Sequence, residues 1–175
     1  MPIITTSRLL LRPFTTSDRT ALTRIVADPT SMRLWPSPDQ ADAVDAWVEH
    51  CRATVPEDGH GCLAVTLRGD GRCIGDCGVL RRSVDGQEMS VIRWTIQAPH
   101  WERGYAVEAA IAVRDKVFMR HGLERLHACI AWDHVAAQRV AERIGMTRIY
   151  EFEHPVDHQT RTYVYMMARN SRQAT

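Results

Sequence analysis

The middle of the chain carries a strand pattern that passes through a short charged turn into a long helix. The strand is expected over Met89 to Ile96 and ends before Pro99, and the helix is expected over Gly104 to Arg120, closed by Gly122. Small residues at the helix start let backbone N–H groups face outward, where unpaired amides and the helix dipole favour an anion. Arg103 can add positive charge at the rim. Taken alone, the segment fits a phosphate site and a tightly packed helix start equally well.

The remaining elements follow an order typical of a mixed α/β (α+β) fold. Gly69-Asp70-Gly71 and Asp85-Gly86 suit tight hairpin turns, while Ser37, Pro38 and Gln40 form a helix-start signal. Further strands are expected at Arg8 to Phe14, Cys62 to Leu67, Arg72 to Leu80, Leu126 to Trp132, Thr147 to Glu153 and Arg161 to Ala168, and further helices from Ser17 to before Pro29, from Pro38 to Ala53 and from His134 to Ile144. No repeat or linker-like break interrupts this order, so we predict one domain over residues 1–169 and a disordered tail over residues 170–175.

Composition and charge exclude several classes of protein. With 45% hydrophobic and 25% charged residues, the chain is of the ordinary globular kind, which excludes disordered, collagenous and membrane classes. Its 22 basic and 21 acidic residues leave a net charge of +1, without the surplus that holds a nucleic-acid backbone. No apolar run approaches the length of a membrane span or a signal peptide. We therefore predict a cytoplasmic protein with no nucleic-acid or membrane partner.

The five cysteines suggest neither a disulfide framework nor a metal site. Their odd number and scattered positions suit small buried residues in a reducing compartment. Cys73 and Cys77 are expected on one face of a strand, but about 13 Å apart along it, too far to share an ion. His60 and Cys62 have no second pair at zinc-finger spacing. No metal is therefore expected.

The central segment resembles the cofactor loop of a known superfamily. Trp101 to Ala109 (WERGYAVEA) is similar to the acetyl-CoA pyrophosphate loop of the GNAT N-acetyltransferases, whose pattern is Gln or Arg, two residues, Gly, one residue, then Gly or Ala. Gly104 and Ala106 match the last two positions, and Trp101 stands at the first. That Trp and the residues after Gly104 resemble the branch that contains the ribosomal-protein-alanine N-acetyltransferases. Three further segments resemble motifs of this branch and follow one another in the right order: Thr6 to Pro13 (TSRLLLRP), Ile74 to Gly78 (IGDCG) and Val140 to Met146 (VAERIGM).

The resemblance implies a fold, a co-substrate and a set of contacts. The fold is a mostly antiparallel sheet of six to seven strands, splayed at its centre and flanked by about four helices. The acetyl-CoA arm is expected in the splay between Met89 to Ile96 and Leu126 to Trp132. Acetyl transfer proceeds by direct attack of an amine on the thioester, so no cysteine nucleophile is required. The implied cofactor contacts are the backbone of Thr95 and Ile96, the loop residues Trp101, Glu102, Arg103, Gly104, Tyr105, Ala106 and Val107, and His134.

The catalytic positions depart from the family pattern. Many relatives carry a carboxylate on the strand before the loop, but this chain has Val91 there, and Glu88 is expected on the opposite face as a solvated hairpin charge. Relatives often have Asn, then Ser three residues later, where this chain has His134 and Ala137. His134 is the one catalytic candidate, because imidazole titrates near neutral pH. A solvated or capping residue at the helix start is the alternative interpretation.

The expected partner is a primary amine, either a small molecule or a protein N-terminus, and a homodimer is left open. Four tryptophans are expected in the core or in the wall of a pocket: Trp35, Trp47, Trp94 and Trp132. A polar turn that can also meet a cationic amine is expected to contain Glu151, Glu153, His154, Asp157 and His158. The alternative to an enzyme is an acyl-CoA-binding or sensing domain that has lost turnover. Val91 and Ala137 argue for that alternative.

Overall fold

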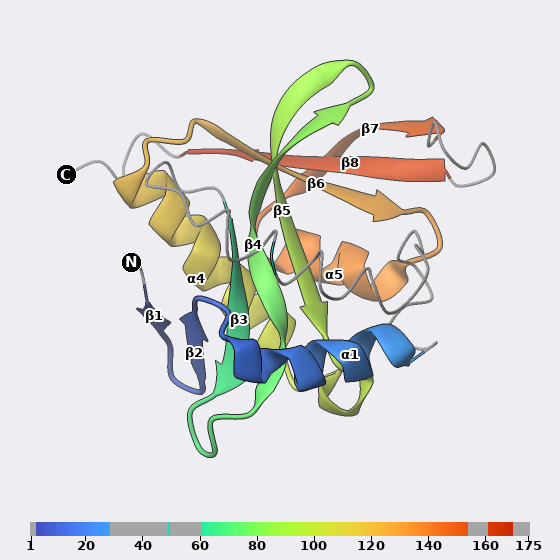
Figure 1. Cartoon of the computed structure of the whole chain (residues 1–175). Helices are drawn as coiled ribbons and strands as arrows, with labels where there is room; N and C mark the ends of the chain where they lie inside the picture. Colours follow the sequence, from blue (N-terminus) through green and yellow to red (C-terminus); the bar gives the residue numbers. More distant parts are fainter. Residues whose placement is uncertain (1–2, 29–48, 50–60, 154–160, 170–175) are drawn as a thin grey trace.

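A single mixed sheet organises the chain. The computed structural model describes residues 3–28, 49, 61–153 and 161–169, and within them the sheet has eight strands in the order β1-β2-β3-β4-β5-β6-β8-β7 (Figure 1). The strands are β1 (Ile4–Thr5), β2 (Leu9–Arg12), β3 (Gly61–Leu67), β4 (Cys73–Val84), β5 (Gln87–Ile96), β6 (Arg125–Ala131), β7 (Thr147–Glu153) and β8 (Arg161–Ala168). The helices of the described residues are α1 (Arg19–Ala27), α4 (Tyr105–Arg120) and α5 (Val135–Arg143), with short 3-10 turns η1 (Thr16–Asp18) and η2 (Ala98–His100).

The predicted fold class is confirmed, and the described elements follow the expected order, with small differences in the strands. β1 is an additional strand of only two residues, too short to show a periodic pattern. The β4–β5 hairpin stays paired up to its turn, since Val84 pairs with Gln87 across Asp85 and Gly86, which both have positive φ. The expected helix from Pro38 to Ala53 and the expected tail lie outside the described residues, as do Trp35, Trp47, His154, Asp157 and His158.

The sheet opens between β5 and β6. All other neighbouring strands are antiparallel, whereas β5 and β6 are parallel and paired only at Val91 and His127. Beyond that pair, towards their C-terminal ends, the two strands diverge, and Figure 1 shows β6, β8 and β7 leaning away from β3, β4 and β5. The splay expected at the centre of the sheet is therefore present.

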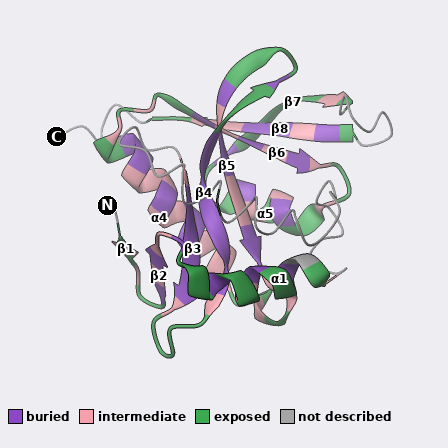
Figure 2. Cartoon of the chain, viewed as in Figure 1, coloured by how far each residue is buried: buried purple, intermediate pink, exposed green. Residues whose placement is uncertain are grey.

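Helices cover both faces of the sheet. Alternation along β3 sends Leu63 and Val65 into the core beneath α4 and α5, and Cys62 and Ala64 into a smaller cluster beneath α1. The main core takes Ala109, Ala110, Val113, Val117 and Phe118 from α4 and Ala137 and Ala141 from α5. Figure 2 shows this burial along the central strands and the inner sides of these helices. Among the described residues, no helix has the length and apolar character to span a membrane.

The expectation that Cys73 and Cys77 share one face of a strand is wrong. The pairing of β3 with β4 slips between Val65 and Thr66, and this irregularity breaks the alternation of β4. Cys73 therefore packs in the cluster under α1, and Cys77 in the main core. Burial raises the pKa of the Cys73 thiol to about 12. The four described cysteines are all unpaired thiols.

Candidate active site

The turn before α4 ends in a left-handed glycine that leaves the helix start uncapped. Gly104 is the N-cap residue with φ 77°, and within the described part of the chain no side chain makes a cap hydrogen bond to the helix start. The Glu108 N–H donates to the Gly104 carbonyl at 3.0 Å, so the N–H groups of Tyr105, Ala106 and Val107 have no carbonyl of the same helix to bond. These amides and the helix dipole together favour an anion at this point.

Trp101 fastens the turn to the end of β5. Its indole N–H donates to the Ile96 carbonyl, and its backbone N–H donates to the Ala98 carbonyl at 3.0 Å. The residue is nevertheless 41% exposed. Trp101 therefore holds the uncapped helix start close to the edge of β5 that borders the splay.

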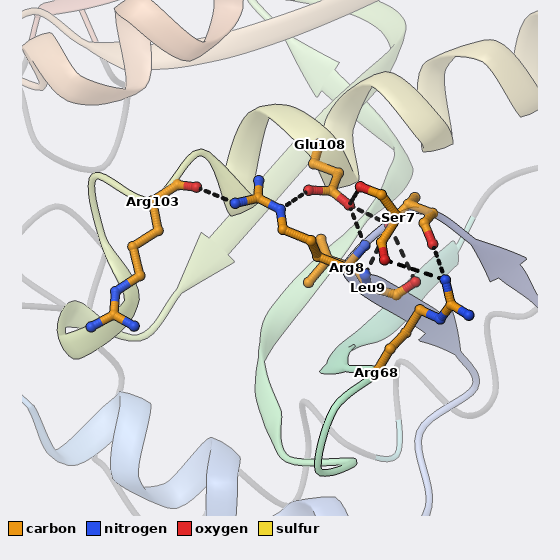
Figure 3. Close-up of polar contacts among 7 residues, drawn as sticks. Ser7, Arg8, Leu9, Arg68, Arg103 and Glu108 are labelled. Carbon is orange, nitrogen blue, oxygen red and sulfur yellow. Dashed lines mark hydrogen bonds and ion pairs between the residues drawn. The ribbon is translucent and has the colours of Figure 1, made fainter.

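Glu108 connects α4 to the N-terminal segment, a contact that our sequence analysis missed. One of its carboxylate oxygens accepts from Thr6 Oγ1 at 2.6 Å, Ser7 Oγ at 3.0 Å and the Arg8 N–H at 2.9 Å, and the other accepts from Arg8 Nε at 2.6 Å (Figure 3). Burial raises the pKa of Glu108, but these hydrogen bonds outweigh it, so that the pKa lies below its usual value. The stability the carboxylate contributes is therefore present above the pKa of an unfolded glutamate and is lost as the pH falls through the lower folded-state pKa.

Thr95 and Ile96 direct their backbone groups to opposite sides of β5. The Gln97 N–H donates to the Ile74 carbonyl at 2.8 Å, and a Cβ added at Gly75 would lie 1.9 Å from the Thr95 carbonyl oxygen. The Thr95 carbonyl is thus directed at β4, and alternation turns the backbone of Ile96 towards the splay. Of the two backbone positions expected to meet the cofactor, only Ile96 faces the gap.

A buried charged cluster lies beside Thr95, on the face of β4 and β5 that is opposite to the main core. Asp76 on β4 is 2% exposed, and Arg93 on β5 places Nε 3.3 Å from its Oδ2. Arg93 Nη2 also donates to Thr95 Oγ1 at 2.9 Å. Burial raises the pKa of Asp76, and the Arg93 guanidinium opposes that rise. A single Asp within the otherwise apolar and Gly-rich run Ile74 to Gly78 is the sequence signal for this cluster.

The three positions considered for catalysis, Val91, Glu88 and His134, lie at different places relative to the splay. Val91 is buried at the vertex of the splay, and Glu88 is exposed next to the β4–β5 turn, opposite Ser83. His134 is half-buried at the N-cap of α5. Its backbone N–H donates at 3.0 Å to the carbonyl of Ala131, the last residue of β6. Because parallel strands end at the same edge of a sheet, His134 and the Trp101 turn follow strands that border the same opening.

The other candidate residues lie in the core, on the surface or in an ion pair. Trp94 packs against the main core and Trp132 is exposed. Glu151 forms an ion pair with Arg161 at 3.6 Å. Within the described residues, no group of three or more His, Cys, Asp or Glu side chains is placed to hold a metal ion.

A family model, a curated relative and two solved structures are similar to this chain. A protein-family model described as "Acetyltransferase (GNAT) domain" matches residues 8–147 of this chain. The uncharacterized N-acetyltransferase YnaD of Bacillus subtilis is 29% identical over 147 residues, 83% of this chain and 82% of YnaD. A GNAT-family acetyltransferase from Bacillus anthracis superposes with a TM-score of 0.82 at 24% identity, over 96% of this chain and 99% of the other. RimJ from Mycobacterium smegmatis, solved in complex with CoA-disulfide, superposes with a TM-score of 0.75 at 16% identity, over 91% and 81% of the two chains.

The two structural likenesses establish a common fold, and the family match runs from β2, through the splay and the uncapped start of α4, to the beginning of β7. The chain belongs to the GNAT family of acetyltransferases.

Proposed function

We propose that this acetyltransferase transfers the acetyl group of acetyl-CoA to a primary amine, by direct attack of the amine on the thioester. The observation that carries the proposal is the uncapped start of α4, held by Trp101 at the edge of an open splay. The pyrophosphate lies against the amides of Tyr105, Ala106 and Val107, and the pantetheine arm follows the exposed edge of β5. The RimJ complex with CoA-disulfide supports this choice of co-substrate.

The chain's own groups contribute position and electrostatics. The amine must arrive neutral, since its nitrogen lone pair forms the new C–N bond as the C–S bond breaks. A backbone N–H on the splay side of β5 stabilises the oxyanion that develops on the thioester oxygen. The proton lost by the amine passes to solvent, and the departing thiolate takes up a proton. The acceptor is either a small-molecule amine or a protein N-terminus.

Binding and turnover can be tested separately. Titration calorimetry with CoA should show saturable binding to the wild-type chain, and a thiol-release assay over a panel of small amines and N-terminal peptides should show CoA production with some of them. Binding without release on the whole panel would favour the acyl-CoA-sensing alternative, for which the apolar residues Val91 and Ala137 argue. A wild-type chain that binds no CoA would contradict both interpretations.

The role of His134 can be resolved by two substitutions. We propose that His134 contacts the cofactor arm or gives a proton to the departing sulfur, since it starts α5 at the mouth of the splay. If it only binds, His134→Asn should keep turnover while His134→Ala loses it. If it transfers a proton, His134→Asn should lower turnover and remove an inflection near neutral pH from the rate profile. His121→Asn, at the C-cap of α4, is the control. Wild-type rates and pH profiles in both His134 variants would assign it to helix capping alone.

Glu88 should be dispensable for turnover. It is exposed beside the hairpin turn and points to the opposite face from Val91, so it cannot reach an amine at the splay. Glu88→Gln is expected to leave kcat within about twofold of wild type. A fall of about 100-fold with CoA binding intact, the usual scale of acid–base catalysis, would show that a general base had been overlooked.

A further inference from the structure

Arg8 reaches from the N-terminal segment across to the turn before α4. Its Nε is held by Glu108 at 2.6 Å, while its Nη1 donates to the Arg103 carbonyl at 2.8 Å. The guanidinium also lies over the Tyr105 ring, 4.6 Å from the ring centroid. Figure 3 shows the Arg8 side chain between Glu108 and the Arg103 carbonyl, with the Arg103 side chain extending the other way. One cation thus contacts the turn and the first two turns of the helix together.

The contact with Arg103 determines which way a peptide group of the turn faces. In a planar trans peptide the carbonyl and the following N–H point in opposite directions. Because Arg8 binds the Arg103 carbonyl, the Gly104 N–H is directed away from Arg8. Rotation of that peptide would exchange the two groups and turn a carbonyl oxygen towards an anion that the N–H would otherwise meet.

The turn needs such a restraint because its backbone is unfavourable. Glu102 has φ 60° and Gly104 has φ 77°, and left-handed geometry at a residue other than glycine persists only where its surroundings hold it. Arg8 is itself held by a carboxylate that accepts four hydrogen bonds from residues 6–8. The N-terminal segment therefore provides a fixed support for the turn, across 100 residues of sequence.

We propose that Arg8 is a positioning residue for the cofactor: it keeps the Arg103–Gly104 peptide oriented with its N–H towards the pyrophosphate. The inference rests on the proposed use of acetyl-CoA. It predicts that Arg8 matters for the part of the co-substrate that carries phosphate and not for the thioester, the amine or the chemical step.

The test compares acetyl-CoA with acetyl-pantetheine, which lacks the pyrophosphate. Arg8→Gln should raise the KM for acetyl-CoA about tenfold, which corresponds to about 1.4 kcal/mol, with kcat and the KM for the amine little changed. Turnover of acetyl-pantetheine should equal that of wild type, which also shows that the variant is folded. Arg8→Lys should behave like Arg8→Gln, because an ammonium cannot hold Glu108 and the Arg103 carbonyl in one planar fork.

Arg68→Gln is the matched control. Arg68 donates to the Thr6 and Ser7 carbonyls at 2.8 and 3.2 Å, so it braces the same segment, but it has no hydrogen bond to the turn among the described residues. Its acetyl-CoA KM should be unchanged. An Arg8→Gln KM equal to that of wild type would overturn the proposal, and so would equal losses with both thioesters or recovery of wild-type affinity in Arg8→Lys. Failure of the wild-type chain to bind CoA would instead contradict the proposed function.

Discussion

Replacing Gly104 with valine should weaken CoA binding by about 100-fold, equivalent to about 2.7 kcal/mol. At φ 77° a β-branched residue is strongly disfavoured, so the chain must shift the turn to relieve the strain. Among the described residues, a Cβ at this position would meet Arg8 Nη2 alone, at 3.5 Å, so the expected loss comes from the displaced amides and the added bulk rather than from a clash in the core. Calorimetry with CoA measures the effect directly.

Gly86→Val separates this effect from general backbone strain. Gly86 has φ 73°, and no atom of the described residues lies within 4 Å of a Cβ added there. It lies in the β4–β5 turn, at the opposite end of β5 from the turn before α4. It should lose stability without losing CoA affinity. Gly104→Ala, which adds only the Cβ, should fall between wild type and Gly104→Val. Wild-type CoA affinity in a folded Gly104→Val variant would show that the pyrophosphate does not lie against this helix start.

Local patterns predicted most of the secondary structure because each signal acts over a few residues. Hairpin turns such as Asp85-Gly86 and the glycine that starts α4 depend on backbone conformations that only certain residues tolerate. The slip between Val65 and Thr66 could not be predicted in this way, because it arises in the pairing with β4. Because of this irregularity, the alternation of residues along the strand predicted the wrong face of the sheet for Cys73.

The contacts that support the site were harder to predict, since they join distant segments. The motif Thr6 to Pro13 and the helix residue Glu108 each stood out in the sequence, but nothing in their spacing showed that they bind one another. Asp76 and Arg93 were not expected to pair either, although the hairpin register that joins β4 to β5 makes them neighbours. Chain topology, rather than residue type, creates these interactions.

Asp76→Ala should lower the free energy of unfolding by about 3 kcal/mol, the scale observed when one partner of a buried ion pair is removed. The Asp76 side chain is 3% and the Arg93 side chain 16% exposed, so the substitution leaves a guanidinium largely shielded from water and without its carboxylate. Thr95 Oγ1 would remain as an acceptor for Arg93, but a hydroxyl does not neutralise the charge. Urea unfolding, with midpoint and slope both fitted, measures the change.

Two further variants test whether burial of the ion pair causes the loss of stability expected for Asp76→Ala. The ion pair of Asp70 and Arg72 is shorter, at 2.6 Å, but its side chains are 43% and 67% exposed, so Asp70→Ala should leave stability nearly unchanged. In the double variant Asp76→Ala, Arg93→Leu, much of the lost stability should return, because apolar replacement of both partners also removes the guanidinium that Asp76→Ala deprives of this carboxylate. If Asp76→Ala cost no more than Asp70→Ala, water would have to screen this pair. That result would contradict the burial of the pair as the reason for the expected loss.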